Sequence, residues 1–68
     1  MTDYIDIICK QYNITREVYW LCDTFHFGSQ DEMYVDSLKI LYNHGCVEPE
    51  RPGGWIETQK LRNILNIK

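Results

Sequence analysis

Two prolines and two glycines in the last third of the chain restrict its fold more than any other feature. Pro49 and Pro52 exclude a helix interior, because proline lacks the backbone N–H and its ring clashes with the preceding turn. Pro52, Gly53 and Gly54 together are typical of a tight turn. We therefore predict a short β-hairpin or extended loop over residues 46–57, with Cys46-Val47-Glu48 and Trp55-Ile56-Glu57 as its two arms.

The residues before this segment repeat with the period of a helix. Apolar side chains recur at i, i+3, i+4 and i+7 near the N-terminus, at Ile5, Ile8, Cys9 and Tyr12. Similar stripes run through Val18, Leu21, Cys22 and Phe25, and through Tyr34, Leu38, Leu41 and Tyr42. We predict three helices, over residues 3–12, 15–27 and 30–44, and a C-terminal helix over residues 58–66 with Leu61, Ile64 and Leu65 facing inward.

Residues that cap helices mark several of these boundaries. Thr15 and Thr58 are good N-caps, because a hydroxyl oxygen can accept from a backbone N–H in the first turn. Ser29 and Glu32 have the spacing of a capping box and would open the third helix. Gly45 is placed to end that helix in the left-handed conformation.

The size of the chain predicts one domain, residues 1–68, of the mainly α class. A domain of 68 residues buries only about 60% of the surface of its unfolded chain. Nine aromatic residues add apolar area, and some of them are expected at a boundary that a partner could cover. Three cysteines, an odd number, favour reduced thiols, and no apolar run is long enough for a membrane span. We expect a cytoplasmic protein.

Charge is distributed unevenly along the sequence. Residues 1–36 contain seven acids and two bases, a net charge of −5, whereas residues 37–68 contain three acids and five bases, a net charge of +2. The total of −3 argues against indiscriminate nucleic-acid binding, which needs a basic surface. The basic C-terminal half keeps DNA open as an alternative partner.

Residues 25–56 resemble the helix-turn-helix and wing of bacterial winged-helix regulators of the gluconate-repressor type. Ser29 stands where that family opens its recognition helix, and the family's Leu-x-x-Leu-x-x-x-Gly-x-Val-Glu pattern is matched from Leu38 to Glu48. Pro52 to Ile56 then corresponds to the wing tip and its return strand. The resemblance implies a small winged-helix-like domain and, in its usual function, a DNA-binding transcriptional regulator.

Two chemical functions have little support in the sequence. Cys22, His26, His44 and Cys46 supply enough ligands for a tetrahedral zinc, but their spacing is not that of a zinc finger. Asp23 and His26 could form a dyad, but neither a nucleophile motif nor a phosphate-binding loop accompanies them. We therefore expect neither a metal or other cofactor nor catalysis.

The favoured hypothesis is a non-catalytic binding protein, an inhibitor or adaptor that recognises a protein with a basic surface. Its binding residues would be on the third helix, and they are three acids and one aromatic anchor: Asp31, Glu32, Asp36 and Tyr34. The winged-helix family carries arginine and threonine at this place. Small phage inhibitors, including those that block CRISPR complexes, resemble this profile. The alternative, DNA binding, would use Arg51, Lys60 and Arg62 on phosphates, and a homodimer through the terminal helices remains open.

Overall fold

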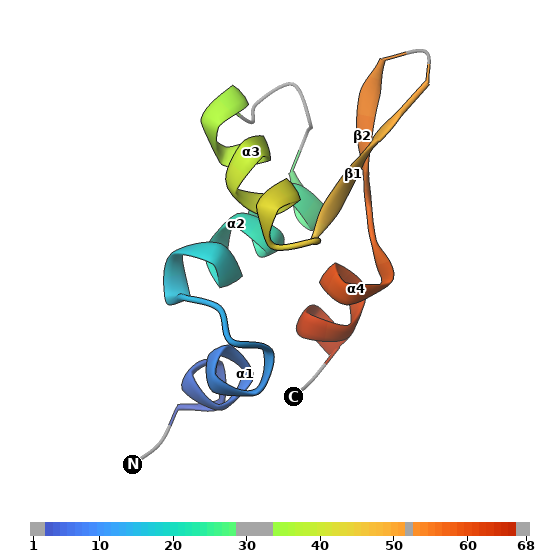
Figure 1. Ribbon diagram of the computed structural model, residues 1–68. Coiled ribbons are helices and arrows are strands. Elements are labelled where there is room, and N and C mark those ends of the chain that lie inside the picture. Colours follow the sequence, from blue (N-terminus) through green and yellow to red (C-terminus); the bar gives the residue numbers. More distant parts are fainter. Residues whose placement is uncertain (1–2, 29–33, 52, 67–68) are drawn as a thin grey trace.

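The computed structural model describes residues 3–28, 34–51 and 53–66. Four helices and a two-stranded antiparallel hairpin follow one another, as α1 (Tyr4–Tyr12), α2 (Arg16–Phe27), α3 (Val35–Asn43), β1 (Val47–Glu50), β2 (Gly54–Glu57) and α4 (Gln59–Asn66). This order and the mainly helical class confirm the prediction. Figure 1 shows α1 at one end of the molecule and the hairpin at the other, with α2, α3 and α4 between them. None of these helices is long and apolar enough to cross a membrane.

Local capping signals explain where the first two helices begin and end. The Asp3 carboxylate accepts from the backbone N–H of Ile5 at 3.2 Å and caps α1. Asn13 ends α1 in the left-handed conformation, with φ of 54°, which asparagine tolerates better than most residues. The Thr15 hydroxyl accepts from the N–H of Val18 at 3.2 Å, which confirms Thr15 as the N-cap of α2.

The predicted start of the third helix is wrong. Tyr34 has an extended backbone, with φ of −72° and ψ of 150°, and it is the N-cap of α3. The helix therefore begins at Val35. Tyr34 lies before it, whereas the predicted range 30–44 placed Tyr34 inside the helix. Among the described residues, no side-chain hydrogen bond caps this end. The proposed capping box of Ser29 and Glu32 lies outside the described residues.

The hairpin has the predicted place and nearly the predicted arms. Val47 pairs with Glu57 at the open end and Glu50 with Gly54 next to the tip. Pro49 lies within β1, opposite Trp55. A proline is acceptable there because a two-stranded sheet has only edge strands, and its missing N–H need not face a ladder partner.

A short junction, residues 44–46, connects α3 to β1 and is hydrogen-bonded to the start of the last helix. Gly45 has φ of 74°, and the backbone N–H of Cys46 donates to the carbonyl of Leu41, which confirms the predicted glycine stop. Three successive carbonyls of the junction then accept from the start of α4. His44 O accepts from Lys60 Nζ at 2.6 Å, Gly45 O from the Thr58 hydroxyl at 2.5 Å, and Cys46 O from the Thr58 N–H at 3.0 Å.

The core lies where α2, α3, α4 and the start of β1 meet, and α1 extends it along α2. Its fully buried side chains come from every helix, from the junction and from the first residue of β1: Ile8, Cys22, Leu41, Cys46, Val47, Leu61 and Ile64. Leu65, predicted to face inward, is only partly buried. Tyr34 and Tyr42, which continue the predicted stripe of the third helix, are 82% and 53% exposed.

Replacement of Gly45 by alanine should lower the free energy of unfolding by about 1 kcal/mol or more, because a Cβ is strained at φ of 74°. Space is not the cause, since a Cβ there would meet only Lys60 Cδ, at 3.8 Å. Gly45→Asn should cost less than Gly45→Ala, because asparagine tolerates the left-handed region. Urea unfolding of the three proteins measures this. Equal stability of Gly45→Ala and the unaltered chain would contradict it.

Candidate partner-binding surface

The most exposed large apolar side chains of the described residues stand at the end of α2 and the start of α3. Phe27 is 77% exposed, Tyr34 is 82% exposed and Val35 is 67% exposed. Tyr34 is extended, and Asp36, in the first turn of α3, is exposed as well. Of the four residues predicted to bind a partner, Tyr34 and Asp36 are thus at the surface, and Asp31 and Glu32 lie outside the described residues.

The charge around these side chains is entirely negative in the sequence. Residues 21–36 contain four acids, Asp23, Asp31, Glu32 and Asp36, and neither lysine nor arginine. Asp36 also suits its place in the first turn of α3, where the helix dipole favours a negative charge. An aromatic side chain among acids can bury area against a partner while the acids select a positive surface.

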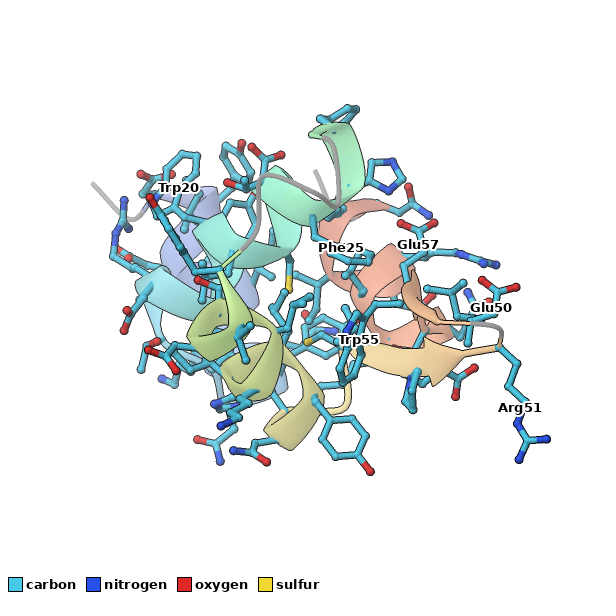
Figure 2. The ribbon with its side chains drawn as sticks, turned by 90° about the horizontal axis from the view of Figure 1, so that it is seen from above. Trp20, Phe25, Glu50, Arg51, Trp55 and Glu57 are labelled. Atoms are coloured by element: carbon cyan, nitrogen blue, oxygen red, sulfur yellow. The ribbon has the colours of Figure 1, made fainter. Side chains whose placement is uncertain are left out.

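The three residues predicted to contact phosphates occupy different settings. Arg51 is exposed at the hairpin tip and points away from the molecule (Figure 2), but its hairpin also carries Glu48, Glu50 and Glu57. Lys60 donates to the carbonyl of His44 at the end of α3, where a cation offsets the negative end of the helix. Arg62 donates from Nε to Glu57 Oε1 at 3.0 Å. Two of the three cations therefore serve contacts inside the protein.

A cluster that the sequence did not predict links three elements. Glu57, at the end of β2, binds His26 of α2 through Oε2, with 2.5 Å to Nδ1, and Arg62 of α4 through Oε1. Burial raises the pKa of Glu57, but the two hydrogen bonds outweigh burial and hold its pKa below the usual 4.5. The 31 residues between His26 and Glu57 explain why no local pattern predicts the contact.

The four residues considered as zinc ligands fall into separate settings. Cys22 of α2 and Cys46 of the junction are fully buried and in contact, and their hydrogen bond, together with burial, raises the pKa of Cys22 above its usual range. His26 is engaged with Glu57. Among the described residues, no three histidine, cysteine or acidic side chains gather as a metal site would need. All three cysteines are free thiols.

Trp55 lies on the side of β2 that faces the helices. It is partly buried and packs against the core. Its ring meets that of Tyr42 edge-on, with 5.8 Å between the centroids, and Figure 2 places it near the middle of the molecule. Trp55 therefore fastens the hairpin to α3 and is less accessible to a partner than the aromatic residues at the end of α2 and the start of α3.

Comparisons of the chain with models of protein families, with curated proteins and with solved structures found no match. The likeness of residues 25–56 to winged-helix regulators therefore stays a prediction.

The Glu57 cluster predicts a loss of stability in acid. A carboxyl whose pKa is lower in the folded than in the unfolded chain contributes stability above its unfolded value, here 4.5, and loses it as pH falls through the folded value. Glu57→Gln should therefore cost about 1 kcal/mol at neutral pH and flatten the decline in stability below about pH 4.5.

The matched control for this variant is Glu48→Gln, an exposed carboxylate of β1 without an ion pair among the described residues. Thermal melts between neutral pH and about pH 3 compare the two. Parallel curves for Glu57→Gln and the unaltered chain would show that the cluster contributes nothing.

Proposed function

We propose that this chain is a non-catalytic binding protein that acts as an inhibitor or adaptor by docking on a protein with a basic surface. The contact is the segment from the end of α2 to the first turn of α3, with Phe27, Tyr34 and Val35 as apolar anchors and Asp36 beside them. Asp31 and Glu32, which stand between the anchors in the sequence, belong to the same proposed surface.

The exposure of the anchors is the observation that carries this proposal. Phe27, Tyr34 and Val35 each leave more than 60% of their surface in water, in a chain of only 68 residues. Surface apolar residues scattered singly are ordinary. Here two aromatic residues and a valine are exposed at the two ends of the connection between α2 and α3, and exposed aromatic residues are typical anchors of binding surfaces. Aromatic anchors at the centre of an interface supply much of the binding energy, because burial removes their area from water.

The charge pattern determines the kind of partner. Acids surround the anchors in the sequence, so a basic protein surface gains complementary potential and faster association. Nucleic acid would meet repulsion there. At the other candidate surface, the hairpin contributes three glutamates and one arginine, and Lys60 and Arg62 already bind acceptors of the protein. A protein partner therefore agrees better with the described contacts than DNA does.

Binding should depend on Tyr34 and on the neighbouring acid. We expect Tyr34→Ala to weaken binding about 10-fold or more, as loss of a central anchor does. Asp36→Lys should weaken it chiefly by slowing association, and added salt should mimic that effect. The immobilised chain is used to capture proteins from a nuclease-treated lysate, and the captured protein is then purified for association and dissociation rates.

The control is Tyr42→Ala, which removes a half-exposed tyrosine near the end of α3, and circular dichroism checks that losing its contact with the Trp55 ring leaves the fold intact. It should bind as the unaltered chain does. The proposal is wrong if Tyr34→Ala and Tyr42→Ala bind alike, or if the chain binds duplex DNA with a salt dependence that Arg51→Ala reduces.

A further inference from the structure

A second surface, formed by α1 and α2, also exposes apolar side chains. Tyr4 and Ile7, one turn apart on α1, are 49% and 51% exposed, and Trp20 of α2 is 49% exposed. Tyr19 joins them, since its ring stands 5.4 Å from that of Trp20 at 82° and its hydroxyl is hydrogen-bonded to Tyr4. Burial, then this hydrogen bond, raises the pKa of Tyr19 to about 12. Tyr19 is itself buried, at 6% exposed, and thus links Tyr4 of α1 to Trp20 of α2 from beneath the exposed side chains.

This surface lies away from the hairpin. Figure 2 shows Trp20 at the edge of the molecule opposite Arg51, on the side where α1 lies. Burial on α1 is confined to its inner stripe of Ile5, Ile8 and Cys9, so Tyr4 and Ile7 face outward. We call the outward stripe of Tyr4, Ile7 and Trp20 the α1–α2 face.

Both signs of charge flank the α1–α2 face. Arg16 already pairs with Asp6 at 2.5 Å and with Asp3 at 3.7 Å. Lys10 continues the stripe of α1 one turn after Ile7, and Glu17 stands one turn before Trp20 on α2. Both are exposed, and neither has an ion-pair partner within the described part of the chain. Among the described residues, α1 thus carries one unpaired cation and α2 one unpaired anion, each one turn from an apolar residue of the α1–α2 face.

We propose that a second copy of this chain covers the α1–α2 face in a two-fold symmetric dimer. Symmetry brings the same face of each copy together, and in the proposed arrangement Lys10 of one copy lies opposite Glu17 of the other, so that the pair occurs twice. Ile7 and Trp20 bury their exposed area at the centre. This surface is separate from the one that binds the basic partner.

The charge of the face selects a second copy over a basic protein. Residues 3–20 contain three acids and two bases, a net charge of −1, whereas residues 21–36 carry −4. Two copies would repel each other strongly through the second segment. Through the first they meet with both signs present, which is what a self-complementary interface requires.

Sedimentation equilibrium of the full chain, over a range of concentrations up to about 1 mM, tests the dimer. The unaltered chain should show a monomer–dimer equilibrium, and Ile7→Asp should abolish it by placing a charge in the centre. Val35→Asp, which alters an exposed aliphatic residue on the other surface, should dimerise as the unaltered chain does. Circular dichroism checks that both variants keep their helices. A monomer at every concentration, or a dimer that persists in Ile7→Asp, overturns the proposal.

A charge swap tests the pairing itself. Lys10→Glu and Glu17→Lys should each raise the dimer dissociation constant about 3- to 10-fold, because exposed ion pairs contribute modestly and the dimer contains two. The double variant Lys10→Glu/Glu17→Lys restores the pair with reversed signs and should recover most of the affinity. A double variant that dimerises no better than the single variants overturns the proposed arrangement. No other protein is needed, so the result is independent of the basic partner.

Discussion

The rest of the structure depends on the junction after α3, where three successive backbone carbonyls accept hydrogen bonds from the start of α4. Thr58 supplies two of these bonds and Lys60 the third. A backbone carbonyl that is withdrawn from water costs free energy unless it finds a donor, and these three bonds hold the chain where it returns after the hairpin. Because the start of α4 is held against the junction, Leu61 and Ile64 of α4 are buried in the same core as Leu41.

Contacts within the protein change how much of its formal charge a partner meets. By count, the C-terminal half is positive, yet Lys60 and Arg62 bind acceptors of the protein and Arg16 binds two acids of α1. Arg16 and Arg62, whose charges are offset by carboxylates, contribute less to the field that a distant partner meets than unpaired cations on the surface would. The four carboxylates of residues 21–36 have neither lysine nor arginine among them in the sequence. A protein with a modest net charge can in this way present one strongly acidic segment.

Local signals predicted most of the fold, and contacts between distant residues account for the rest. Thr15, Asn13 and Gly45 act through their own backbone or the next turn, so their effects could be inferred from the sequence alone. The predicted start of the third helix was wrong because Tyr34 has an extended backbone, whereas the capping box of Ser29 and Glu32 lies outside the described residues and stays a prediction. The bonds of Glu57 with His26 and of Lys60 with His44 join residues 31 and 16 positions apart. They arise only once the helices have packed.

The three thiols can report which part of the molecule opens, because they lie in different parts of it. Cys9 is on α1, which rests on α2 at one end, whereas Cys22 and Cys46 are in contact at the centre. A thiol reacts with an alkylating reagent only when water reaches it and it loses its proton. Detachment of α1 alone would thus expose one cysteine, and separation of α2 from the junction would expose the other two. The order in which the thiols are modified therefore distinguishes fraying of one helix from loss of the whole fold.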